Sequence, residues 1–96
     1  MVKDREENYN VENLLGSRAR VKILKLLAKN KELSISQIIK QTKLNHKSVK
    51  SHLSYLESFN LIQEKVFGRI KIYRYKFENI RAKSLGKFIE IWEGEL

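Results

Sequence analysis

The sequence contains no cysteine, and this absence excludes several kinds of chemistry at once. Without thiols the chain of 96 residues can form no disulfide, no thiolate metal site and no cysteine nucleophile. No apolar run approaches the roughly 18 residues that a membrane-spanning helix needs. The segment Met1 to Asn10 is polar and charged, unlike a signal peptide. We therefore expect a cytoplasmic protein with no membrane partner.

Patterns typical of enzymes are also missing. The sequence has no glycine-rich phosphate loop, no plausible pair of base and nucleophile, and no cluster of carboxylates. Its two histidines are accompanied by a single aspartate, Asp4, and by no cysteine, which does not make a metal site. These absences predict a protein that is not an enzyme and that needs no metal or cofactor.

Positive charge, in contrast, is abundant and concentrated in the middle of the chain. Lysine and arginine number 20 against 11 acidic residues, which gives a formal net charge of +9. Fifteen of the basic side chains but only three of the acidic ones lie in residues 15–77. A phosphate backbone is the commonest partner of such a block, although a solvated lysine-rich surface has the same composition.

Length and hydrophobic periodicity predict one domain over residues 1–96, with an N-terminal arm over 1–12. Apolar side chains three and four residues apart indicate a short amphipathic turn over 10–16. The same spacing predicts three helices, at residues 18–29, 35–41 and 46–59. Ser17, Ser34 and Asn45 stand at the expected N-caps. Residues 32–33 read as a short extended link, and Asn60 is placed to stop the third helix.

A hairpin and a final helix are predicted next. Strands over 61–67 and 70–77 flank a Gly68–Arg69 turn, in which glycine supplies the unusual backbone angles. The alternation in the second strand is irregular, so we expect a hairpin with a buried base and an exposed tip. A helix over 78–93 ends the chain within the segment 78–96. This order, with a very short connection between the second and third helices, is that of a winged helix-turn-helix, mainly α with a small β-hairpin wing.

Two stretches resemble the ArsR-like winged-helix regulators of prokaryotes. The first is LGSRAR at 15–20 with ILKLL at 23–27, which resembles the opening helix of that family. The second is SVKSHLSYL at 48–56, followed by FNLI at 59–62. The resemblance covers about residues 13–77 and implies the winged-helix fold, DNA binding and dimerisation through the last helix.

The family's metal sensors carry ligands that this chain does not match. Where arsenic sensors of the family often have two cysteines, the chain has Ser34 and Ser36, and a hydroxyl is a poor ligand for a thiophilic metal. The last helix also lacks the Asp and His that the zinc sensors use. The resemblance therefore implies DNA binding without the family's usual metal effectors.

The third predicted helix is the expected recognition helix. At about 100° per residue, its polar face lies opposite the apolar stripe of Val49, Leu53 and Leu56. Polar side chains on that face can reach base edges and phosphates. The predicted contacts from this helix are His46, Lys47, Ser48, Lys50, Ser51 and Ser54. An ordinary solvated face is the plainer interpretation.

The wing offers a second set of cations. Arg69 lies at its tip, where a guanidinium can enter the minor groove or bind a phosphate. The predicted contacts from the wing are Lys65, Arg69, Lys71 and Arg74. Near the first helix, Arg18, Arg20 and Lys22 either add backbone contacts or cover the core. His52 borders the apolar stripe, and we expect its ring to pack and one of its nitrogens to be hydrogen-bonded.

The last helix carries an apolar stripe that needs a packing partner to be removed from water. Its members are Leu85, Phe88, Ile89 and Trp92. Because the hairpin already closes the three-helix core, we expect this stripe to pair with a second copy in a homodimer, the alternative being packing on its own domain.

Together these features predict a sequence-specific transcriptional regulator that binds double-stranded DNA as a homodimer. The recognition helix 46–59 would lie in the major groove, and the wing 61–77 on the backbone or in the minor groove. One alternative is a protein-interaction winged helix of the transcription machinery, which would not need a basic recognition face. Another is an RNA-binding or non-specific chromosome-binding protein, whose affinity would depend little on sequence.

Overall fold

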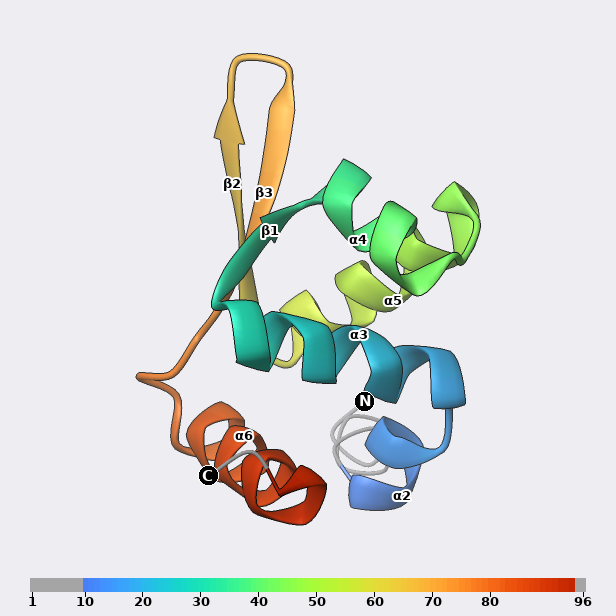
Figure 1. Cartoon of the computed structure of the whole chain (residues 1–96). Coiled ribbons are helices and arrows are strands. Elements are labelled where there is room, and N and C mark those ends of the chain that lie inside the picture. Colours follow the sequence, from blue (N-terminus) through green and yellow to red (C-terminus); the bar gives the residue numbers. More distant parts are fainter. Residues whose placement is uncertain (1–9, 95–96) are drawn as a thin grey trace, which may run out of the picture.

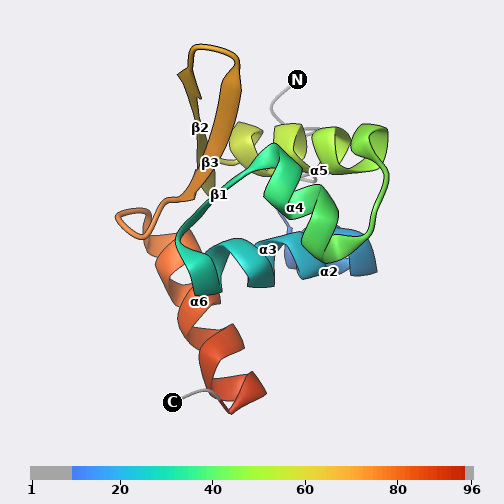
Figure 2. The ribbon, with the colours of Figure 1, turned by 45° about the horizontal axis from the view of Figure 1, so that its top comes forward.

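The structure, a computed structural model, describes residues 10–94 (Figures 1 and 2). The elements in chain order are α2 (Val11–Leu15), α3 (Arg18–Asn30), β1 (Glu32–Ser34), α4 (Ile35–Thr42), α5 (His46–Ser58), β2 (Ile62–Phe67), β3 (Ile70–Tyr75) and α6 (Ile80–Glu93). None of the described helices is long and apolar enough to cross a membrane.

The two predicted terminal segments lie partly outside the described residues. Residues 1–9 of the predicted arm lie outside the described residues, and Val11 and Glu12 belong to α2. Residues 95–96 of the C-terminal segment also lie outside them, whereas α6 ends at the predicted Glu93.

The predicted N-caps are confirmed. The Ser34 side chain and Gln37 form a reciprocal capping box at the start of α4. The Asn45 side chain accepts a hydrogen bond of 2.7 Å from the backbone N–H of Ser48 in α5, and the Ser17 side chain caps α3 in the same way. Each such cap contributes about 1 kcal/mol of stability by satisfying an N–H that the helix itself leaves unpaired.

The core lies between α3, α4, α5 and the base of the sheet. The predicted apolar stripes of α3 and α5 are fully buried, α4 contributes the fully buried Ile38, and the sheet adds two tyrosines. The buried apolar side chains are Ile23, Leu24, Leu27, Leu33, Ile38, Val49, Leu53, Leu56, Leu61, Ile62, Tyr73, Tyr75 and Ala82. Burial of each large member contributes roughly 1.5–3 kcal/mol, so this layer supplies most of the driving force for folding.

The sheet has one strand more than the predicted hairpin. Residues 32–33, expected as a link, belong to β1, which pairs antiparallel with β3 so that the strand order is β1-β3-β2. Leu33 lies opposite Tyr73 and is itself buried. A strand of only three residues has too few positions to show an alternation, so its pairing depends on the distant β3.

The predicted contrast between base and tip of the hairpin is confirmed, but its bounds need correction. Tyr73 and Tyr75 are buried, whereas Phe67 and Ile70 beside the turn are more than half exposed. Strand β3 ends at Tyr75 rather than at residue 77. Helix α6 begins at Ile80 rather than at residue 78, because Asn79 takes the N-cap and accepts hydrogen bonds from two backbone N–H groups.

Tyr75 joins three parts of the molecule. Its backbone N–H donates to the carbonyl of Lys31 at the end of α3 (2.8 Å), and across the sheet it faces Ile62 of β2. Its hydroxyl, which is fully buried, donates to the carbonyl of Ala82 in α6 (2.7 Å). Burial raises the pKa of Tyr75 to about 12, so the hydroxyl keeps the proton that it donates.

Replacing Tyr75 by phenylalanine should therefore lower stability while the ring stays in place. The lost buried hydrogen bond is worth about 1 kcal/mol, which lowers Tm by roughly 4–8 °C in a domain of this size. Thermal unfolding followed by circular dichroism measures this shift. An unchanged Tm for Tyr75→Phe would contradict the assigned role.

Candidate nucleic-acid interface

A buried threonine fixes the turn between α4 and α5. The Thr42 hydroxyl donates to the carbonyl of Ile38 (2.7 Å) and accepts from the backbone N–H of Leu44 (3.3 Å). Its own carbonyl accepts from the ammonium group of Lys22 on α3 (3.1 Å). Lys43 then takes a left-handed conformation with φ of 61°, which ends α4 and permits the sharp turn. Thr42 was not among the predicted functional residues; its signal in the sequence is a threonine at the end of the second predicted helix.

Helix α5 presents one apolar and one polar face. Val49, Leu53 and Leu56 are fully buried, so the opposite side of the helix points to solvent. Ser48 is half-buried. The exposed members of the predicted set are His46, Lys47, Lys50, Ser51 and Ser54. The orientation predicted from the 100° periodicity is thus the one that the fold adopts, and this face carries no acidic side chain between residues 46 and 54.

Behind this face, Arg20 connects the first helices to α5. Its guanidinium carbon lies 3.6 Å from the ring centroid of Tyr55, and Nη1 donates to the carbonyl of Asn13 (2.6 Å). Of the two roles left open for Arg20, the structure supports the packing one. Lys22 likewise bonds Thr42, whereas Arg18 is exposed. Cation–π pairs of this kind contribute about 0.5–2 kcal/mol, and this one connects the start of α3 to α5.

His52 lies on the inner edge of the recognition helix. Its side chain is half-buried, and its Nδ1 atom is buried with no hydrogen-bond partner among the described residues. Burial lowers the pKa of His52, and the nearby positive charge of Arg20 lowers it further. The imidazole is therefore neutral at pH 7. The expected packing of the ring is present, whereas the expected hydrogen bond is not found among the described residues.

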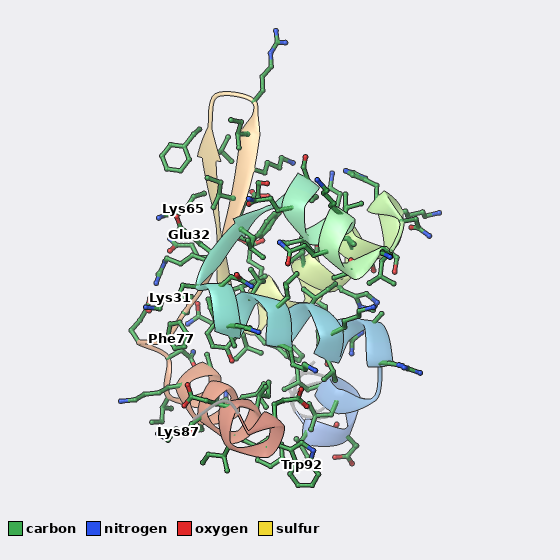
Figure 3. All side chains as sticks on the ribbon, viewed as in Figure 1. Lys31, Glu32, Lys65, Phe77, Lys87 and Trp92 are labelled. Carbon is green, nitrogen blue, oxygen red and sulfur yellow. The ribbon has the colours of Figure 1, made fainter. Side chains whose placement is uncertain are left out.

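Two of the four wing cations, Arg74 and Lys65, are paired with acidic or amide side chains of the same chain. Arg74 makes a double contact with the Glu78 carboxylate (2.7 and 3.1 Å) and also donates to Gln63. This contact lowers the pKa of Glu78 to about 2, so both partners stay charged at neutral pH. Lys65 reaches Glu32 across the sheet at 3.4 Å (Figure 3).

The other two wing cations make no such pairs. Arg69 is exposed at the turn, where Gly68 adopts a φ of 62°, and Lys71 is half-buried on β3. Neither makes a hydrogen bond or ion pair within the described residues. The hairpin stands clear of the helices, on the side where α4 and α5 lie (Figure 1). Arg69 and Lys71 are thus the wing cations most accessible to a partner.

A second surface lies at the other end of the molecule. Helix α6 leads away from the domain (Figure 2), and its Phe88 and Trp92 are 53% and 76% exposed. Of the other predicted interface residues, Leu85 is half-buried against the core and Ile89 is half-buried beside α3. An open groove of about 540 Å³ runs between α6 and α2, lined mostly by apolar side chains. The contribution of α2 to this surface was not predicted, because an element of five residues carries only one apolar triad.

No group of three or more potential metal ligands occurs among residues 10–94. Ser34 acts as the N-cap of α4, and Ser36 is exposed in its first turn.

Comparison with known proteins agrees with this geometry. The family model of bacterial regulatory proteins of the arsR family matches residues 17–64, half of the chain. No curated protein sequence matches the chain significantly. Among solved structures, HlyU from Vibrio cholerae is 18% identical with a TM-score of 0.76, over 96% of this chain and 97% of that one. PagR, a transcriptional repressor of Bacillus anthracis, is 22% identical with a TM-score of 0.70, over 93% and 99% of the two chains.

A further similar structure is a homodimeric winged helix-turn-helix DNA-binding domain from Mycobacterium bovis, a possible ArsR-family regulator. It is 25% identical with a TM-score of 0.69, over 88% of this chain and 76% of that chain.

The buried position of His52 predicts a pH dependence of stability. Its pKa in the folded state lies below the 6.5 of an exposed histidine, so the unfolded chain binds a proton more readily as the pH falls. Above about pH 7, His52 is neutral in both the folded and the unfolded chain and does not affect the free energy of unfolding. Stability is lost as the pH falls through 6.5 toward the lowered pKa of the folded state. Unfolding by urea at pH 7.5 and pH 5 measures the loss. His52→Gln should reduce it, whereas His46→Gln, at an exposed position, should leave it unchanged. Equal losses in all three proteins would refute this prediction.

Proposed function

The chain belongs to the ArsR family of bacterial regulatory proteins and is a DNA-binding transcriptional regulator, and from this premise we propose how it binds. In the proposal, two copies bind one duplex, each with α5 in the major groove and its wing on the adjacent backbone or minor groove. Residues 1–96 act as a single winged-helix domain in which α6 is the dimerisation helix. The proposal places the protein in the cytoplasm and gives it no enzymatic role.

The outward face of α5 carries the proposal. A helix in the major groove needs polar side chains that are free to reach base edges, on a support that does not move. Lys47, Lys50 and Ser51 meet the first need, since all three are exposed. Buried Thr42 and the Arg20–Tyr55 contact meet the second. We assign base reading to Lys50 and Ser51, with Ser48 and Ser54 beside them, and phosphate contacts to Lys47 and His46.

On the wing, we assign the DNA contacts first to Arg69 and Lys71. Lys65 and Arg74 would have to give up Glu32 and Glu78 before they could bind a phosphate. Both pairs are exposed to water and salt, which weaken them, so DNA can compete for these cations, but the pairs favour a supporting role at the base of the wing.

Substitutions on α5 and on the wing should have different effects. Lys50→Ala or Ser51→Ala should reduce the discrimination between a selected duplex and a random one, since a lost base contact costs about 1–3 kcal/mol on the cognate site. Arg69→Ala should weaken binding to both duplexes about equally and should reduce the slope of log affinity against log salt by about 1. Fluorescence anisotropy at 50–200 mM salt measures both quantities.

Three outcomes would count against this assignment. Flat salt dependence of the unmodified protein would refute DNA binding, because phosphate contacts release counterions. Steep salt dependence with equal affinity for all duplexes would indicate a non-specific chromosome-binding protein. If neither α5 substitution changed discrimination, α5 would not be the recognition helix.

We also propose that the homodimer forms through α6 and α2. Trp92 projects from the far end of α6 (Figure 3), and its ring lies 5.7 Å from that of Phe88. Phe88 and Trp92 form an aromatic ridge on α6. Beside this ridge lies the apolar groove between α6 and α2, into which Val11 and Leu15 also expose apolar surface. A ridge and a groove on one face can each receive the other across a two-fold axis, as a symmetric interface requires. The similar domain from Mycobacterium bovis is itself homodimeric.

Removing the aromatic ridge should separate the two copies. Truncation of a buried aromatic side chain typically costs about 3–5 kcal/mol, so Phe88→Ala with Trp92→Ala should weaken association by a thousandfold or more. Analytical ultracentrifugation at micromolar concentration measures the oligomeric state. Phe67→Ala removes an equally exposed aromatic ring from the wing and should leave the dimer intact.

The double variant should also lose most of its DNA affinity although α5 is unchanged, because two linked half-sites bind far better than one. A two-fold dimer places its recognition helices about one DNA turn apart, roughly 34 Å, and so favours a near-palindromic site. If the unmodified chain sediments as a monomer at micromolar concentration, the exposed stripe is not a dimer interface.

A further inference from the structure

The tip of the wing exposes an amount of apolar surface that phosphate contacts do not explain. Val66, Phe67 and Ile70 are 58%, 57% and 56% exposed. Phe67 and Ile70 are paired directly across the two strands, immediately before and after the Gly68–Arg69 turn. A cross-strand pair of this kind stabilises a hairpin, which accounts for the contact between the two side chains but not for their exposure.

The apolar side chains lie on both faces of the hairpin. Because partners in an antiparallel ladder share a face, Phe67 and Ile70 lie together on one side. Val66 lies on the other side, which is the side of the buried Tyr73 and Tyr75. The tip of the hairpin, which we call the blade, is therefore thin and carries apolar side chains on both of its faces.

Cations surround this blade. Arg69 lies at its end, Lys71 faces Val66 across the strands, and Lys65 is two residues before Phe67. The nearest carboxylate on the hairpin, that of Glu64, accepts a hydrogen bond from the Tyr73 hydroxyl (2.7 Å). A DNA duplex has a negatively charged phosphate backbone and apolar stacked bases. Apolar side chains surrounded by cations are therefore complementary to it, since the cations can bind phosphates while the apolar side chains insert between two stacked bases.

We propose that the wing tip is a wedge that enters the minor groove beside the major-groove site and opens a base step with Phe67 and Ile70. The undistorted minor groove is about 6 Å wide, too narrow for a two-stranded ribbon with side chains on both faces. Entry therefore requires a kink, and pyrimidine–purine steps such as TpA kink at the lowest cost. The wedge would select flexible flanking steps without hydrogen bonds to bases. This inference rests on the proposed DNA binding and names a sequence feature that α5 does not read.

The test measures DNA bending by the full chain. The probe is a duplex of about 30 base pairs, selected from a random library by the unmodified protein and labelled at its two ends for energy transfer. Side-chain wedges kink DNA by roughly 20–90°, and the unmodified protein should shorten the end-to-end distance accordingly. With Phe67→Ala and Ile70→Ala combined, the bound duplex should return toward its free length. Phe67→Leu should keep the bend, because leucine also serves as a wedge.

A second measurement tests selectivity for the step. Replacing the flanking TpA by ApA should weaken binding of the unmodified protein by about tenfold, and the Phe67→Ala, Ile70→Ala variant should show no such preference. Arg69→Ala is the control at the same tip, and it should weaken binding to both duplexes while the bend persists. All the replaced side chains are exposed and lie outside the core, so the domain should fold, and circular dichroism of each variant checks this. Phe67→Leu, which keeps a cross-strand apolar pair, controls for loss of the hairpin itself.

The outcomes separate this inference from the proposed function. If the unmodified protein binds no duplex, both fail. If it binds but leaves the duplex straight, or if the double variant bends DNA as well as the unmodified protein does, the wedge is refuted and DNA binding stands. A last measurement tests whether the protein binds vesicles of phosphatidylglycerol and phosphatidylcholine. Binding to them that depends on Phe67 and Ile70, with no effect of these residues on DNA bending, would assign the tip to a membrane surface instead.

Discussion

The buried side chain of Tyr75 is the constraint on which the arrangement of this molecule depends. Its backbone belongs to the central strand of the sheet, its N–H bonds the end of α3, and its hydroxyl bonds a carbonyl of α6. A buried hydroxyl without a partner costs about 1–3 kcal/mol, so the first turn of α6 must lie where its carbonyl can accept this proton. One residue thus connects the wing, the end of α3 and the first turn of α6.

Charge is distributed according to two different tasks. On the outer side of the sheet, Arg74 and Lys65 are paired with carboxylates, which fixes the base of the wing. On the outward face of α5 and at the turn of the wing, Lys47, Lys50 and Arg69 make no ion pair with any carboxylate of residues 10–94. Positive potential therefore remains where a phosphate backbone would lie, while the cations of the supporting parts are neutralised locally. The net charge of +9 alone does not reveal this division.

Within residues 10–94, apolar surface is exposed at two extremities of the molecule. One is the ridge and groove of α6 and α2, and the other is the tip of the wing. A chain of this size closes only a modest core, so apolar residues outside it are available to partners. The first surface is broad and concave in part, as suits a second copy. The second is thin and ringed by cations, as suits a groove between phosphates.

The helices, the hairpin and their order could be predicted from local features of the sequence, whereas strand β1 could not. Apolar spacing, polar N-caps and the Gly68 turn act within about four residues, and these local signals correctly predicted the helices, the polar face of α5 and the exposed tip of the hairpin. Tertiary structure alone decided the pairing of β1 with β3, the stacking of Arg20 on Tyr55 and the attachment of Arg74 to Glu78 and Gln63. It also decided that α2 shares a groove with α6. These contacts depend on where distant segments meet, or on which of several competing partners a flexible charged side chain reaches, and no periodicity in the sequence records either.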